Sequence, residues 1–200
     1  MDLREFERFC RQNDLRIFTV NDLKVLLSGL SPEYLRVKVG RWAEKGVIRI
    51  LKKGVYAFAE AVPDEFEIAA KLVTPSYISL ESALSHYSII PEVGAEVTSI
   101  TSKNTRHFNV GGTRYEYYHI KQPLFSDFVY LTNGVLIATR EKAILDFIYF
   151  RKPLPDHPFF ERLNASALKD VNFSRLKQIS KIYPAWAQKI TKHFIYAAAK

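Results

Sequence analysis

Apolar residues recur every three to four positions between residues 20 and 45, which is the spacing of one face of an α-helix. The first helix is expected after Thr19, whose side chain can accept a hydrogen bond from the amide of Asp22 as an N-cap. Gly29 is expected to end it, because glycine readily takes the left-handed conformation that follows many helices. The apolar face of this helix comprises Leu23, Leu26 and Leu27.

A second helix is expected over residues 31–45. Ser31 is its N-cap, Pro32 takes the first helical position, where a missing N–H costs nothing, and Gly46 follows its end. Its buried face comprises Leu35, Val39, Trp42 and Ala43. The next residues, 47–58, predict two strands joined by a turn at 52–54. Two helices with a short turn, followed by a hairpin, have the spacing of a winged helix-turn-helix domain.

Basic side chains are concentrated in this segment. Residues 31–54 hold seven lysines and arginines and two glutamates, a net charge of +5 (7 − 2). Because an α-helix fits the major groove of DNA, we expect the polar side of the second helix to face the bases, through Tyr34, Lys38 and Arg41. We expect phosphate contacts from Lys45, Arg49, Lys52 and Lys53. The alternative is that these charges only solvate the outer face of a helical subdomain.

A short link between two domains is expected at residues 60–64. Beyond it, the apolar residues first follow a helical period and then a period of two. Helices are expected over residues 66–73 and after Tyr77 and Ile78, where Ser79 can act as an N-cap. From residue 97 a period of two predicts five strands, with turns at two glycine-containing pairs. These strands are residues 97–101, 106–110, 115–120, 128–131 and 135–138.

The last third of the chain is predicted to be helical. Thr139 caps a helix over 140–150 that is apolar nearly all round and should be buried, and two more helices follow over 174–182 and 184–198. The expected fold class is therefore α+β. An N-terminal winged helix-turn-helix domain (1–60) precedes an α/β domain (64–200) with a mostly antiparallel sheet flanked by helices.

The overall charge of +8 is uneven, because residues 164–200 hold seven basic residues and one acidic residue, a net charge of +6 (7 − 1). A concentrated positive charge attracts anions. We therefore expect a second anion-binding face on the last two helices, for DNA or another nucleic acid, with a merely solvated surface as the alternative. The outward lysines are Lys177, Lys181, Lys189 and Lys192.

Several classes of protein are disfavoured by the composition. Cys10 is the single cysteine, which excludes an intramolecular disulfide and a zinc ribbon. No run approaches the roughly 20 apolar residues of a membrane span, and the first residues have no apolar signal region, so a cytoplasmic location and no membrane partner are expected. The histidines lack metal-binding spacing, and we find no nucleophile elbow or phosphate loop. No cofactor, metal or catalytic residue is expected.

Six short motifs follow one another between residues 14 and 150. They are Phe18-Thr19 with Asp22, 44–48 (EKGVI), 53–56 (KGVY), 75–84 (PSYISLESAL), 90–92 (IPE) and 139–146 (TREKAILD). In this order they resemble the AbiEi-like antitoxins of bacterial type IV toxin–antitoxin systems. Two glycines of the family pattern are replaced here, one by Ser88 and one within Ser126-Asp127. The tail beyond Arg151 matches no motif of the family.

The resemblance implies a two-domain protein. Its winged domain would bind inverted repeats in its own promoter and repress it, and its second domain would oppose a nucleotidyltransferase-like toxin without needing a stable complex. Antitoxin function is expected to involve the motif residues Glu141, Lys142 and Asp146, together with the tail lysines. By position alone these three have sufficient structural roles, since Glu141 suits a helix N-terminus and Lys142 can pair with Asp146.

Two other functions are compatible with the residues. A solitary winged-helix repressor, whose second domain senses a ligand or dimerises, would have no neighbouring toxin gene. A metal-dependent nuclease would need clustered carboxylates and a lysine. Its candidates are Asp64, Glu65, Glu67 and Lys71, or Asp127, Glu141 and Lys142, but neither set has the carboxylate-x-lysine spacing of such nucleases.

Overall fold

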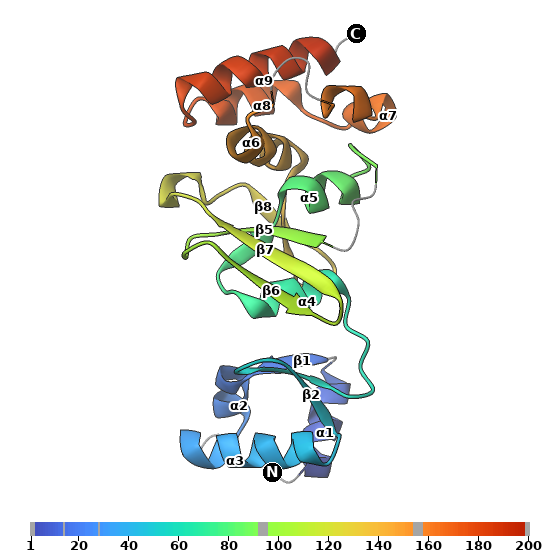
Figure 1. Cartoon of the computed structure of the whole chain (residues 1–200), viewed down its shortest axis with the longest axis vertical. Coiled ribbons are helices and arrows are strands. Elements are labelled where there is room, and N and C mark those ends of the chain that lie inside the picture. The colour runs from blue at the N-terminus through green and yellow to red at the C-terminus, as the bar shows by residue number, and fades with distance from the viewer. Residues whose placement is uncertain (1–2, 14, 28, 92–95, 154–157, 199–200) are drawn as a thin grey trace. The chain divides into compact units, whose positions relative to one another are not determined.

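The computed structural model describes residues 3–13, 15–27, 29–91, 96–153 and 158–198. Asp14 and Glu92, which fall in the stretch that carries the six motifs, lie outside the described residues. The fold is mixed α+β, and the chain forms two compact units, Met1–Leu72 (unit 1) and Val73–Lys200 (unit 2) (Figure 1). The division therefore follows Leu72 and does not fall within the link expected at 60–64.

Unit 1 consists of helices around a small sheet. Its sheet has three strands in the order β1-β3-β2, and both pairings are antiparallel. The elements are α1 (Leu3–Gln12), β1 (Ile17–Thr19), α2 (Val20–Leu26), α3 (Pro32–Glu44), β2 (Ile48–Lys52), β3 (Val55–Phe58) and α4 (Glu65–Leu72). Helix α4 belongs to this unit because Ile68 packs against the buried Ile17, Val55 and Ala57 of the sheet.

Local hydrogen bonds explain where α2 and α3 begin. Thr19 and Asp22 form a reciprocal capping box, in which the Asp22 amide donates to Thr19 Oγ1 (3.1 Å) and the Thr19 amide donates to Asp22 Oδ2 (2.7 Å). Ser31 Oγ accepts the amide of Tyr34 at the start of α3 (3.2 Å). Gly46, with φ +69°, follows the end of α3. These caps and the hairpin confirm the expected elements, whereas β1 was not expected.

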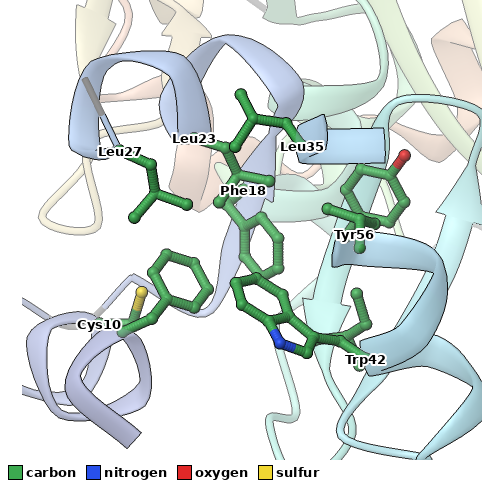
Figure 2. Close-up of a cluster of buried hydrophobic side chains, with 10 residues drawn as sticks. Cys10, Phe18, Leu23, Leu27, Leu35, Trp42 and Tyr56 are labelled. Atoms are coloured by element: carbon green, nitrogen blue, oxygen red, sulfur yellow. The ribbon is translucent and has the colours of Figure 1, made fainter. Parts of the chain in front are cut away.

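The main core of unit 1 joins α1, α2 and α3 to the sheet. Figure 2 shows Cys10, Phe18 and Trp42 among the side chains that meet there. The ring of Phe6 stacks on Trp42 with centroids 5.0 Å apart and meets Phe18 edge-on at 5.2 Å. Burying large aromatic side chains contributes strongly to stability, so α3 is held firmly by one face.

Unit 2 is built on a six-stranded sheet in the order β6-β7-β5-β4-β9-β8. Its strands are β4 (Ser76–Ile78), β5 (Glu96–Thr101), β6 (Arg106–Val110), β7 (Thr113–His119), β8 (Phe128–Tyr130) and β9 (Leu136–Ala138). The helices are α5 (Leu80–His86), η1 (Gln122–Leu124), α6 (Arg140–Arg151), η2 (Phe160–Arg162), α7 (Ala165–Leu168), α8 (Phe173–Ser180) and α9 (Ala185–Ala198).

The sheet is mixed, and the expectation of a mostly antiparallel one is met only in part. Between the described strands, β6–β7, β4–β5 and β8–β9 are antiparallel, whereas β5–β7 and β4–β9 are parallel. The helix expected after Tyr77 and Ile78 is present as α5, but these two residues themselves form strand β4, which was not expected. Ser79 does precede α5, but its hydroxyl does not cap the helix; it donates to Asp146.

Helix α6 is the centre of the helical layer of unit 2. Eight consecutive residues, Glu141 to Ile148, are buried, as its all-round apolar pattern predicts. Thr139 caps it by accepting the Lys142 amide (3.3 Å). The helix packs against α5 on one side and against α8 and α9 on the other (Figure 1).

Candidate nucleic-acid interface and a buried polar cluster

Four of the predicted DNA-contacting residues form one stripe along α3. Tyr34, Lys38, Arg41 and Lys45 are spaced by three or four positions, so they follow each other along one side of the helix. Tyr34 is 51% exposed, and Arg41 and Lys45 are also exposed. Lys38 is half-buried, with its Nζ 5.9 Å from the ring centroid of Tyr34 and 5.7 Å from that of Trp42. The structure thus brings these four side chains together.

The basic residues of the hairpin differ in their surroundings. Lys53 is exposed at the turn. Arg49 donates to the carbonyl of Ala61 (2.8 Å), and Lys52 is half-buried and donates to the carbonyl of Leu72, the last residue of α4. A cation there satisfies a terminal carbonyl and suits the helix dipole. Lys52 thus has a structural partner that sequence spacing did not reveal.

Five further exposed residues of α3 were not among the predicted contacts: Glu33, Arg36, Val37, Gly40 and Glu44. Four of them lie on the side opposite the buried Leu35, and Arg36 lies on the flank. The helical period alone could have identified them, because it assigns every residue of a predicted helix to the buried or the exposed face.

Asp146 is the acceptor at the centre of a buried polar cluster in unit 2. Its carboxylate has no exposed surface and accepts hydrogen bonds from the Tyr77 hydroxyl (2.9 Å), Ser79 Oγ (2.8 Å) and the Tyr183 hydroxyl (3.1 Å). Lys142, also buried, pairs with the same carboxylate and donates to the Tyr183 hydroxyl (2.7 Å). A buried charge is tolerated when it is paired and fully hydrogen-bonded, as it is here.

The two tyrosines of this cluster act as donors. Burial raises the pKa of Tyr77 and of Tyr183, and the negative charge of Asp146 raises both further. Both phenols therefore keep their protons and hold the carboxylate in place. The cluster ties β4, α6 and the start of α9 together, since its members come from or beside these elements.

Glu141 also has a partner inside unit 2. Its side chain is buried, and its Oε1 accepts the amide of Asn172 (2.8 Å). Asn172 is in turn the N-cap of α8 and accepts the amide of Arg175 (2.9 Å). Glu141 therefore fixes the start of α8 on α6. The three predicted antitoxin residues of α6 are thus buried and bonded to their own chain.

The four tail lysines are exposed. Lys177 and Lys181 lie one turn apart at the end of α8, and Lys189 and Lys192 lie on α9. Both helices bury their opposite faces, through residues such as Leu176 and Phe194. The predicted outward orientation of the four lysines is confirmed.

The carboxylates considered for a nuclease have structural partners. Asp64 and Glu67 cap α4 reciprocally, each accepting the other's amide at 2.8 Å. Asp127 pairs with Arg175 (3.1 Å). Across the part of the chain that the structure describes, no three histidine, cysteine, aspartate or glutamate side chains are grouped so that they could hold a metal ion. None of the helices described is both long and apolar enough to cross a membrane.

Comparison with known proteins shows the fold of the chain. No family model matches the sequence, and no curated protein matches it. Among solved structures, the chain is similar to the crystal structure of the Rv2827c protein from Mycobacterium tuberculosis, with a TM-score of 0.59 and 14% sequence identity. The match covers 96% of this chain and 75% of that one. At this identity it establishes a similar fold and carries no information about activity.

Proposed function

We propose that this protein is a DNA-binding antitoxin that represses its own type IV toxin–antitoxin operon. Unit 1 would then be a winged helix-turn-helix domain, with α2 and α3 as the helix-turn-helix and the β2–β3 hairpin as the wing. The observation that carries this proposal is the stripe of Tyr34, Lys38, Arg41 and Lys45 along α3.

The shape and charge of α3 suit the major groove. The helix has 13 residues and is roughly 20 Å long. One face is fixed by Trp42 and other buried residues, so the opposite face is presented rigidly. The net charge over residues 31–54 is +5 after the negative charges of Glu33 and Glu44 are subtracted. This charge supplies the attraction to phosphates that non-specific DNA binding requires. Lys53, at the hairpin turn, can reach a phosphate beside the helix.

The antitoxin part of the proposal is supported by the resemblance of the six motifs. In this proposal unit 2 opposes a nucleotidyltransferase-like toxin, which is a functional partner and need not form a stable complex. Glu141, Lys142 and Asp146 contribute by holding α6 and α8 in place, because buried side chains do not meet a partner directly. The exposed tail lysines remain the candidates for direct contact.

Two substitutions test the proposed docking on DNA. Arg41→Ala is expected to weaken binding to inverted repeats from the protein's own promoter by about 1–3 kcal/mol and to relax base preference, because Arg41 would face bases. Lys53→Ala is expected to weaken specific and random DNA alike and to reduce the salt slope by about one, because it would face a phosphate. Titration at several salt concentrations measures both effects.

Lys103→Ala is the control, since Lys103 is an exposed lysine of unit 2 outside the tail. Lys103→Ala should leave base preference unchanged, and it should lower DNA affinity only slightly, through the loss of one distant positive charge. If Arg41→Ala and Lys53→Ala gave the same salt slope and left base preference unchanged, the docking proposal would be wrong.

Co-expression tests antitoxicity separately. The full chain is expected to restore growth to cells that express the product of an adjacent nucleotidyltransferase-like gene, and Arg41→Ala is expected to restore growth equally while losing repression of a promoter reporter. Specific DNA binding without any growth rescue would instead identify a solitary repressor.

A further inference from the structure

The most outward position of α3 is occupied by an apolar residue. Val37 is two positions from both Leu35 and Val39, hence roughly 160° around the helix from each of these buried residues. Its side chain is 51% exposed. Its neighbours one turn away are Glu33, Tyr34, Gly40 and Arg41, all of them exposed.

Gly40 leaves Val37 open on one side. Side chains on a helix point back toward its N-terminus, so a side chain at position 40 would lean over Val37. Glycine has none, and a Cβ built at Gly40 would meet no atom within 4 Å. The helix therefore presents a methyl-bearing side chain, in an uncrowded gap, at the centre of its exposed face.

Val37 and Gly40 do not stabilise the helix itself. Glycine and valine are both poorer helix formers than alanine, and neither packs against the core of unit 1 at these positions. Arg36 and Arg41 lie on the two sides of this face, and Glu33 and Glu44 lie on it, one turn from Val37 and from Gly40. An exposed apolar side chain on a helix that enters the major groove has one well-defined counterpart there, the C5-methyl group of thymine.

We propose that Val37 reads a thymine methyl group in the major groove, and that the gap at Gly40 admits the edge of the base. This inference rests on the proposed DNA-binding function and adds a specificity-determining residue to it. Arg41 lies four residues further on, about 6 Å along the helix axis, which is close to two base-pair steps. A guanine contacted by Arg41 is therefore expected within one or two base pairs of that thymine.

The experiment removes the methyl group from the DNA. The preferred duplex is first selected from random sequences with the full-length protein, and each thymine is then replaced in turn by uracil, which lacks only the methyl. Replacement at one thymine is expected to weaken wild-type binding about fourfold, the equivalent of one buried CH₂ group. The same replacement should have no effect on Val37→Ala, because the contact is already lost.

Val25→Ala is the matched control, because Val25 is an exposed valine of α2 (79% exposed). This variant should keep the full fourfold response to uracil. Both substitutions are at exposed helical positions and replace valine with a better helix former, so folding should be preserved.

Each outcome has a distinct meaning. If the wild type selects no sequence over random DNA, the proposed DNA-reading function fails before the methyl test begins. If it selects a sequence but no uracil replacement matters, or if Val37→Ala responds like the wild type, the inference about Val37 is overturned. Loss of growth rescue by Val37→Ala, with an unchanged uracil response, would identify the residue as a protein-docking position instead.

Discussion

Ser88 takes a backbone conformation that is usually reserved for glycine. Its φ is +57°, and it follows α5 in a Schellman arrangement, where the Ile89 amide donates to the Leu84 carbonyl (2.8 Å) and the Ser88 amide to the Ser85 carbonyl (2.8 Å). A side chain costs roughly 1–2 kcal/mol in this region. The glycine that the family resemblance predicts at this position therefore has a clear physical purpose.

We expect Ser88→Gly to raise the free energy of unfolding of unit 2 by up to about 1 kcal/mol. Relief of the left-handed strain outweighs the greater freedom of glycine in the unfolded chain. Chemical denaturation of the full chain measures the change. Ser85→Gly, inside α5, is the control and should be destabilising by about 0.5–1 kcal/mol. Equal effects of the two substitutions would show that Ser88 carries no strain.

Asp127, the second site of a replaced glycine, also has φ +57°. Here the side chain compensates, because it accepts a hydrogen bond from Ser126 Oγ (2.9 Å) and pairs with Arg175. Aspartate also tolerates the left-handed region better than serine. Both residues therefore adopt the left-handed conformation that suits glycine, and Asp127 alone has side-chain partners that compensate for it.

At the scale of elements, the sequence predicts best those features that are caused by residues close by in the chain. The starts of α2, α3 and α6 are set by side chains within three residues, so Thr19, Ser31 and Thr139 identified them correctly. Strand β1 is only three residues long and exists because it pairs with β3, far along the chain. Its formation depends on tertiary contact, and no local period indicates it.

Competition between partners explains the error at Ser79. A serine before a helix is expected to cap it, but the buried Asp146 offers a charged acceptor, which forms the stronger bond. The partner of Lys52 could not be predicted for the same reason, because the Leu72 carbonyl is twenty residues away in the sequence. Helical spacing therefore placed Tyr34, Lys38, Arg41 and Lys45 on one side of α3, but it did not reveal the partners of Arg49 and Lys52 within the chain.

The buried pair in α6 gives a prediction about stability. Lys142→Met is expected to lower the free energy of unfolding by about 3–5 kcal/mol, because it leaves the Asp146 charge buried without its counter-charge. Adding Asp146→Asn removes that charge while keeping an acceptor for Tyr77 and Ser79, so the double variant should be more stable than Lys142→Met alone. Denaturation of these two variants and of Asp146→Asn alone measures the coupling.

The same variants separate a structural role from a direct one. If Lys142 and Asp146 only hold α6, the double variant, once folded, should still restore growth in the co-expression assay. A folded double variant that fails to rescue would show that these residues take part in antitoxicity. Effects on stability that simply add would show that the two side chains do not act as a pair.

At the scale of the whole molecule, positive charge is concentrated in two segments that belong to different units. Residues 31–54 carry +5 in unit 1, and residues 164–200 carry +6 in unit 2, out of a total of +8. The remaining residues therefore sum to −3 (8 − 5 − 6). The proposed winged domain accounts for the first segment only, and the second needs its own explanation.

The tail lysines are expected to form a second anion-binding face. Changing Lys177, Lys181, Lys189 and Lys192 to glutamine removes four exposed charges and keeps helix propensity, so the variant should fold. If the tail contacts nucleic acid, the dependence of DNA affinity on salt becomes shallower, because fewer counterions are released on binding. If it acts against the toxin's nucleic-acid target, DNA binding is unchanged and growth rescue is lost.

Lys103→Gln combined with Lys121→Gln is the control, because both lysines are exposed in unit 2 outside the tail. Losing these two charges should leave the salt slope and growth rescue close to those of the wild type. A folded four-glutamine variant that keeps full rescue and the full salt slope would mean that the tail charge serves solubility alone. An equal loss in the control would trace the effect to net charge, since long-range attraction depends on total charge as well as on its position.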